Sequence, residues 1–213
     1  MAQTKNGRSW IERHLNDPFV KKAQKAGYRS RASFKLLELH EQDHLFYPGM
    51  KVVDLGAAPG GWSQILVKLV ASTSKGKDQG KVIALDILDM APLGGVHFIQ
   101  GDFLALETVE KLQASLNESP LDWVISDISP NISGMMAVDQ PRIMELADLA
   151  WEFARAHLKK GGGFLVKVFQ GEGFDGFVRG LRQNFEKVSI RKPNASRSAS
   201  RELYVLARGY YNI

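Results

Sequence analysis

Among the residues of this chain, Lys167 has the type and position that most clearly indicate a chemical role. It interrupts a run of phenylalanine, leucine and valine at 164–169, which is typical of a buried strand. An unpaired ammonium is costly to bury, so Lys167 either reaches solvent at the strand end or has a buried partner. Asp127, which ends an earlier strand pattern, could be that partner. A lysine accepts protons only when its pKa is lowered, as burial and a second cation would do.

A glycine-rich turn forms a second candidate site. Asp54 ends a short apolar strand, and the sequence GAAPGGW at 56–62 then turns the chain into a helix. Glycines let the backbone approach a ligand closely, and a helix N-terminus offers unpaired N–H donors. Pro59 breaks the G-x-G-x-x-G spacing of dinucleotide sites. The turn therefore suits a nucleoside ligand without a pyrophosphate better than a dinucleotide.

Acidic residues follow the next two strand patterns. Asp86, followed by Ile87, ends a run at 82–86, where doubly wound folds place a carboxylate that binds ribose hydroxyls. Asp102, after the third strand, could accept a hydrogen bond from an adenine amino group, and Phe103 could pack on the ring. The simpler alternative is that these aspartates cap helices. Aspartates at or just after four successive strands, beside the glycine turn, favour nucleoside binding.

Composition and charge limit the class of protein. The chain has 213 residues, of which 44% are hydrophobic and 24% charged, as in a globular protein. We expect a cytoplasmic protein without a membrane segment, because no apolar run approaches the roughly 18 residues that span a bilayer. The chain has no cysteine, which excludes disulfides, thiolate metal sites and a cysteine nucleophile.

The net charge of +5 hides an uneven distribution. Residues 1–35 hold nine Lys or Arg against two Asp or Glu (+7), residues 36–178 hold eleven against nineteen (−8), and residues 179–213 hold eight against two (+6). Basic ends around an acidic middle are expected if the ends bind a polyanion such as nucleic acid. Solvated basic helices are the alternative interpretation.

Strand and helix patterns alternate through most of the chain. The strand patterns lie at 52–55, 82–86, 96–100, 123–127, 164–169, 187–191 and 203–207. Helical patterns lie at 62–70, 109–116, 142–158 and 177–185. This alternation predicts an α/β fold with a doubly wound, mostly parallel sheet. The last two strands have no helix between them, which predicts an antiparallel edge.

The N-terminal part predicts short helices. Asp17 before Pro18 is typical of a helix start, and Gly27 of a helix end. Ser30 is then expected to cap a second helix at 31–43. We expect these helices to carry the positive charge of the N-terminal part to a ligand-binding edge of the sheet.

Five sequence blocks resemble those of a known family. They are SRASFKL at 30–36, VVDLGAAPGGWSQ at 52–64, SDISPN at 126–131, LVKVFQG at 165–171 and SRSASRELYVLARG at 196–209. In this order they closely resemble the FtsJ/RrmJ family of ribose 2′-O-methyltransferases over nearly the whole chain. The resemblance implies a Rossmann-like, seven-stranded methyltransferase fold and S-adenosylmethionine as cofactor. It also implies one methyltransferase domain over 1–213, with a basic helical extension at 1–48 and a catalytic core at 49–213.

By the same resemblance, four residues match the family's catalytic Lys-Asp-Lys-Glu tetrad: Lys35, Asp127, Lys167 and Glu202. On their own, Lys35 and Glu202 look like ordinary surface residues. A ribose hydroxyl is a poor nucleophile, so methyl transfer to it benefits from a base and from in-line placement. Our hypothesis is that Lys167 accepts the proton, Lys35 places a second positive charge beside it, and Asp127 and Glu202 orient the two lysines. We expect no metal to take part.

The resemblance extends to cofactor contacts and to a substrate. The expected S-adenosylmethionine contacts are Asp54, Gly56, Pro59, Gly60, Gly61, Trp62, Asp86, Ile87, Asp102, Phe103 and Asp127. The implied substrate is a uridine of 23S ribosomal RNA in the assembled or assembling 50S subunit, and we expect a monomer. Residues expected to contact RNA phosphates are Arg8, Arg13, Lys21, Lys22, Lys25, Arg29, Arg31, Arg191, Lys192, Arg197 and Arg201.

Three alternatives stay open. The chain could methylate transfer RNA or a messenger cap, or it could be a cofactor-binding RNA chaperone or assembly factor that has lost turnover. A nicotinamide-dependent oxidoreductase is the third, and Pro59 in the glycine turn argues against it. Methylation of a base is disfavoured, because the chain has no cysteine and the stretch DISPN at 127–131 has no aromatic residue.

Overall fold

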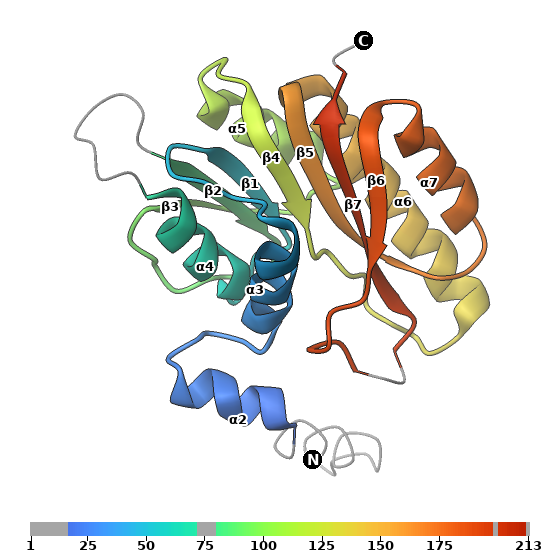
Figure 1. Ribbon diagram of the computed structural model, residues 1–213, viewed down its shortest axis with the longest axis horizontal. Coiled ribbons are helices and arrows are strands. Elements are labelled where there is room, and N and C mark those ends of the chain that lie inside the picture. Colours follow the sequence, from blue (N-terminus) through green and yellow to red (C-terminus); the bar gives the residue numbers. More distant parts are fainter. Residues whose placement is uncertain (1–16, 72–79, 198–199, 212–213) are drawn as a thin grey trace.

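The computed structural model describes residues 17–71, 80–197 and 200–211. In these residues, seven strands form one sheet in the order β3-β2-β1-β4-β5-β7-β6 (Figure 1). Neighbouring strands are parallel except that β7 runs antiparallel to both β5 and β6. The strands are β1 (Lys51–Leu55), β2 (Lys81–Asp86), β3 (Val96–Gln100), β4 (Leu121–Ser126), β5 (Leu158–Phe169), β6 (Phe185–Arg191) and β7 (Glu202–Tyr210). The predicted mostly parallel sheet with antiparallel pairing at one edge is confirmed; the reversed strand itself lies one place in from that edge.

Helices cover both faces of the sheet, as a doubly wound fold requires (Figure 1). Helices α5, α6 and α7 share a hydrophobic cluster on one face, and α3 and α4 share a second cluster on the other. The helices are α2 (Pro18–Lys25), α3 (Ala32–Asp43), α4 (Gly61–Val70), α5 (Leu106–Leu116), α6 (Met136–His157) and α7 (Phe174–Arg182). No helix among the described residues is long and apolar enough to cross a membrane.

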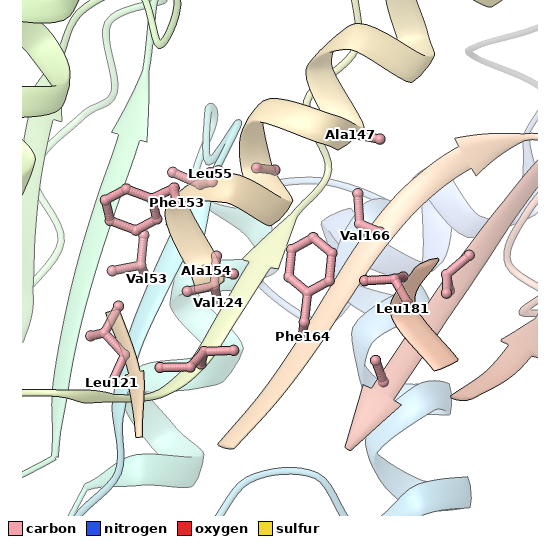
Figure 2. Packing of buried hydrophobic residues seen from close by; sticks show 14 of the residues in the cluster. Val53, Leu55, Leu121, Val124, Ala147, Phe153, Ala154, Phe164, Val166 and Leu181 are labelled. Atoms are coloured by element: carbon pink, nitrogen blue, oxygen red, sulfur yellow. The ribbon is translucent and has the colours of Figure 1, made fainter. Parts of the chain in front are cut away.

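Strand alternation assigns core side chains to the two faces. In the larger cluster, Phe153 and Ala154 of α6 lie with Val53 and Val124 of the central strands (Figure 2). The neighbouring residue in β1, Val52, belongs instead to the second cluster, with the buried leucines of α3 and the indole of α4. Both faces of the central strands are therefore buried, which explains why these strands appear in the sequence as continuous apolar runs.

The carboxyl ends of the parallel strands gather at one edge of the sheet. Asp86 ends β2, Asp127 follows β4 and Lys167 lies near the end of β5. Because β7 is antiparallel to β5, its first residue comes to the same edge, and Glu202 is paired with Phe169 in the register. The reversal of one strand therefore brings a residue from the C-terminal part of the chain to the edge where doubly wound folds bind ligands.

The N-terminal helices lie at this same edge, with α2 beyond α3 (Figure 1). Helix α2 begins as predicted, because Asp17 Oδ1 accepts a hydrogen bond from the Phe19 amide at 3.0 Å. The second predicted cap is wrong: α3 starts at Ala32, and Ser30 Oγ is buried without a partner among the described residues. Helix α3 shares a core cluster with the sheet, so it packs directly on the strands.

Several helix boundaries differ from the sequence expectation, most clearly those of α6 and α7. Helix α6 begins at Met136 instead of 142, with Pro141 inside it. The helix therefore starts six residues earlier than predicted and tolerates a proline that cannot donate a backbone hydrogen bond. Helix α7 begins at Phe174 and is followed by β6 from Phe185, which the sequence had placed in the helix. An apolar phenylalanine fits either pattern, so periodicity does not decide such an end.

Candidate active site

The four charged residues of the predicted tetrad meet at the carboxyl edge of the sheet. Lys35 Nζ lies 2.5 Å from Glu202 Oε1, and Lys167 Nζ lies 3.0 Å from Asp127 Oδ1. Lys167 Nζ also donates to the Asp127 carbonyl oxygen at 2.6 Å. The side chains of Lys35 and Lys167 are only 10% and 8% exposed. The four residues come from α3, β5, β7 and the end of β4, so only the fold brings them together.

Tyr204 joins the two ion pairs and was missed in the sequence. Its hydroxyl lies 2.9 Å from Asp127 Oδ1, 3.0 Å from Glu202 Oε1 and 3.1 Å from Lys35 Nζ. The residue is completely buried, and it is paired with Lys167 in the register of β7 and β5. A tyrosine in an apolar strand looks like a core residue. The available signal was its spacing, since residues 202 and 204 lie on the same face of a strand.

Hydrogen bonds and charges fix the ionisation of Asp127. Burial by itself would raise the pKa of this carboxyl group, but the ammonium groups of Lys167 and Lys35 and the hydrogen bonds from Lys167 and Tyr204 lower it below its ordinary value. Burial also raises the pKa of Tyr204 well above its ordinary value, and both carboxylates add to this effect. Asp127 is therefore a carboxylate and Tyr204 a neutral hydroxyl at neutral pH.

Contacts with α4 hold Lys35 in place through helix α3. Trp62 Nε1 donates to the Ala32 carbonyl oxygen at 2.8 Å, and Ser33 Oγ donates to the Gly61 carbonyl oxygen at 3.0 Å. Trp62 is 3% exposed, and a Cβ on Gly61 would lie 2.2 Å from Ser30 Oγ. Trp62 and Gly61, expected to contact a cofactor, thus pack α4 against the start of α3.

A cavity of about 450 Å³ opens beside the tetrad, within the size range of small-molecule sites. Predicted cofactor residues that line it are Gly56, Asp86, Ile87, Asp102, Phe103 and Asp127. The loop after β4 and helix α6 complete the wall with Ile128, Ser129, Asn131 and Leu146, which the sequence reasoning did not select. Asp127 belongs both to this wall and to the tetrad, so the cavity and the buried lysines form one continuous site.

The cavity fits the adenosine part of S-adenosylmethionine. Asp86 accepts one backbone hydrogen bond at each oxygen, from the amides of Ala58 and Leu88, both at 2.8 Å. Asp102 Oδ1 accepts from the Leu104 amide at 3.0 Å. These carboxylates therefore do form local turns, as the simpler interpretation held. Each oxygen retains acceptor capacity, which ribose hydroxyls and an adenine amino group can use.

Gly56 is required by the closeness of the loop after β4. Its φ of +78° favours glycine, and a Cβ there would lie 2.7 Å from the Ile128 backbone nitrogen. Gly60 is similarly crowded, by the side chains of Met90 and Arg29. The glycine turn therefore serves a close approach between two segments of the cavity wall, as well as any approach of a ligand.

Asp54 and Pro59 do not line the cavity. Asp54 is fully buried, with Oδ2 accepting from Ser63 Oγ at 2.6 Å and Oδ1 without a partner among the described residues. Burial, helped by the charges of Asp127 and Asp86, raises the pKa of Asp54 to about 7, although the hydrogen bond from Ser63 opposes the shift. Pro59 is exposed on the turn. Asp54 therefore supports the glycine turn from a buried position, through its hydrogen bond with Ser63.

The predicted RNA-binding cations differ in their exposure and in the contacts they make within the fold. Arg29 donates to the carbonyl oxygens of Ala91 and Pro92 at 2.6 and 2.7 Å, and Arg191 pairs with Asp43 at 2.8 Å, so both serve the fold. Arg8 and Arg13 lie outside the described residues. The exposed cations are Lys21, Lys22, Lys25, Lys192, Arg197 and Arg201. Arg31, which is half-buried, forms an ion pair with Asp17.

Comparisons with known protein sequences identify relatives of this chain. Residues 28–210 match the model of the FtsJ-like methyltransferases. A protein of Stenotrophomonas maltophilia named ribosomal RNA large subunit methyltransferase E is 55% identical over 98% of this chain and 96% of its own length. The protein of the same name from Nitrosospira multiformis is 54% identical over 98% of both chains.

A solved structure has a similar fold. A crystal structure from Plasmodium falciparum that carries the name ribosomal RNA methyltransferase superposes with a TM-score of 0.74 at 26% identity, covering 86% of this chain and 98% of that one. The family match spans the tetrad and the whole cavity wall. This chain therefore belongs to the family of FtsJ-like methyltransferases.

Proposed function

We propose that the protein transfers a methyl group from S-adenosylmethionine to the 2′-oxygen of a uridine ribose in 23S ribosomal RNA, with Lys167 as the general base. One observation carries the reaction type: Asp127 lines the cavity that fits adenosine and also pairs with a buried lysine at 3.0 Å. A proton acceptor therefore lies next to the place where a methyl donor would bind. Support for a ribosomal RNA substrate comes from relatives that are named for ribosomal RNA methylation and match this chain over almost its full length.

The hydrogen bonds of Lys167 suit a proton acceptor. Its Nζ donates to two oxygens of Asp127, the carbonyl and the carboxylate. A neutral amine has two N–H donors and one lone pair, so both bonds persist when Lys167 is deprotonated and the lone pair can face the substrate hydroxyl. S-adenosylmethionine supplies the methyl group on a sulfonium, which makes it electrophilic. Lys35 and Tyr204 hold Asp127 and Glu202 in place around the lysine.

Two features support binding of a polyanion. Exposed lysines on α2 and basic residues of the loop before β7 flank the tetrad at the same edge of the sheet (Figure 1). Phosphate contacts by such residues give affinity that depends on salt and little on sequence.

Reversing the charges of Lys21, Lys22 and Lys25 should weaken RNA binding and leave cofactor binding unchanged. Unchanged RNA affinity at moderate salt would refute the placement of α2 at the RNA.

One assay tests the chemistry and the substrate together. The protein is incubated with labelled S-adenosylmethionine and with large ribosomal subunits, naked ribosomal RNA or transfer RNA, and the RNA is then digested with alkali. A 2′-O-methyl group blocks cleavage at its own linkage, so label in an alkali-resistant dinucleotide proves ribose methylation. Label in mononucleotides would refute it, and label only with transfer RNA would move the substrate to that class.

A further inference from the structure

A second, smaller pocket adjoins the tetrad. It has a volume of about 210 Å³ and is lined by Arg31, Lys35, Arg197, Ser200 and Glu202. It shares Lys35 and Glu202 with the tetrad and shares no residue with the cavity that fits adenosine. A ligand in this pocket would therefore touch the catalytic group without competing with the methyl donor.

Asp17 holds the two arginines of this pocket. Its carboxylate forms ion pairs with Arg31 Nη1 and, at 3.6 Å, with Arg197 Nε, while Arg31 Nη2 also donates to the Ala195 carbonyl oxygen. Asp17 is 9% exposed and caps α2. The Asp17 carboxylate thus connects the start of α2, the start of α3 and the loop before β7. These contacts also fix the positions of the two guanidinium groups.

The charges of this cluster do not cancel. Arg31, Arg197 and Lys35 carry three positive charges, whereas Asp17 and Glu202 carry two negative ones. Burial and the charge of Arg197 lower the pKa of Arg31, although the charge of Glu202 opposes the shift. The cluster therefore retains one positive charge, which matches the single negative charge of a phosphodiester.

Arg197 is the residue best placed to bind an anion. Its side chain is 47% exposed, and the ion pair that the described residues give it uses Nε. The two Nη groups can then form the paired hydrogen bonds with which arginine binds phosphate oxygens. Ser200 adds a hydroxyl donor in the same pocket.

We propose that this pocket binds one phosphodiester of the RNA, the one next to the ribose that is methylated. The inference rests on the proposed function. The 2′-oxygen and the 3′-phosphate stand on neighbouring carbon atoms of one ribose, so a phosphate beside Lys35 and Glu202 places that oxygen at the tetrad. Arg197 and Arg31 act as positioning residues, which bind the backbone and leave the base to other contacts.

Substitutions of Arg197 test the pocket. Arg197→Gln should weaken RNA binding about tenfold at low salt and reduce the slope of log affinity against log salt concentration by about 1, as expected for one lost phosphate contact. Arg197→Lys should keep most of the slope but recover only part of the affinity, because an ammonium cannot form the paired bonds. The loss should be equal for ribosomal RNA and for an unrelated transfer RNA, since a phosphate carries no sequence information.

The matched control is Arg182→Gln. Arg182 is exposed at the end of α7, just before β6 begins, and so lies at the opposite edge of the sheet. Calorimetry with S-adenosylmethionine should give the same affinity for all variants. If Arg197→Gln behaves like Arg182→Gln, or weakens only ribosomal RNA, the phosphate site is refuted. The binding measurements do not depend on turnover, so absence of ribose methylation in the unmutated protein would refute the proposed function separately.

Discussion

The hydroxyl group of Tyr204 couples the two halves of the active site, and Tyr204→Phe removes it without changing the ring. The ring is buried and packs 5.7 Å from Trp62 between centroids, so the variant keeps its core contacts. The hydroxyl lies within 3.1 Å of Asp127, Glu202 and Lys35, but it has one hydrogen and serves one carboxylate at a time. Hydrogen bonds with charged groups contribute about 1.5–3 kcal/mol.

The expected effect of Tyr204→Phe follows from the contacts that the variant keeps. Asp127 keeps Lys167 and Glu202 keeps Lys35, so both ion pairs survive, but no group links them. If about 2 kcal/mol of that link acts in the transition state, kcat falls roughly 30-fold, since each 1.36 kcal/mol is a factor of ten. The hydrogen bond from Tyr204 lowers the pKa of Asp127, so its loss raises that pKa.

The chain offers a matched control in the same strand. Tyr210 lies in β7, and its hydroxyl donates to the Arg155 carbonyl oxygen at 3.0 Å, away from the tetrad. Tyr210→Phe should cost about 1 kcal/mol of stability and leave kcat unchanged. Both variants are compared by steady-state methylation over a pH series and by urea unfolding. Equal kcat values for the two variants would refute the coupling role of Tyr204.

Three other substitutions test the base, the buried acid and the glycine turn. Lys167→Ala should lower kcat about 10²–10⁴-fold, the usual contribution of a general base, with S-adenosylmethionine affinity intact by calorimetry; substantial remaining activity would contradict its role. The raised pKa of Asp54, about 7, means that the folded protein binds a proton that the unfolded chain loses near pH 4. The free energy of unfolding should therefore fall by up to about 4 kcal/mol as pH rises from 4 to above 7. Urea unfolding of the Asp54→Asn variant over the same pH range should not show this decrease. Gly56→Ala should be more destabilising than Gly27→Ala in thermal unfolding. Both glycines have a positive φ, but only at Gly56 would the new Cβ meet backbone atoms, at 2.7 Å. Equal losses of stability in the two variants would show that only the backbone strain matters.

Much of the fold was predictable because it depends on local patterns. The strands at 52–55, 82–86 and 96–100 are apolar runs bounded by turns, and their positions were right within one residue. The errors fell where a local signal was ambiguous. The helix predicted from residue 142 begins at Met136 and includes Pro141, and Ser30 reads as a cap although its hydroxyl is buried.

The cofactor contacts show a related limit. Asp86 and Asp102 follow strand ends and line the cavity, because strand ends of a parallel sheet lie at one edge. Trp62 and Gly61 stand in the same sequence block, but they face α3. A motif records that residues stand close in sequence. It does not separate those that touch a ligand from those that support the turn.

The sequence by itself determined the order of strands and helices, the charge of the two ends and, through Lys167, the presence of a buried cation that needs a partner. Only the tertiary structure decided that Lys35 and Glu202 meet, that Tyr204 joins them to Asp127, and that Asp17 holds Arg31 beside Arg197. The reason is physical. Secondary structure follows from neighbours a few residues apart, whereas these contacts join residues separated by up to 180 positions, which the antiparallel strand β7 returns to the carboxyl edge of the sheet.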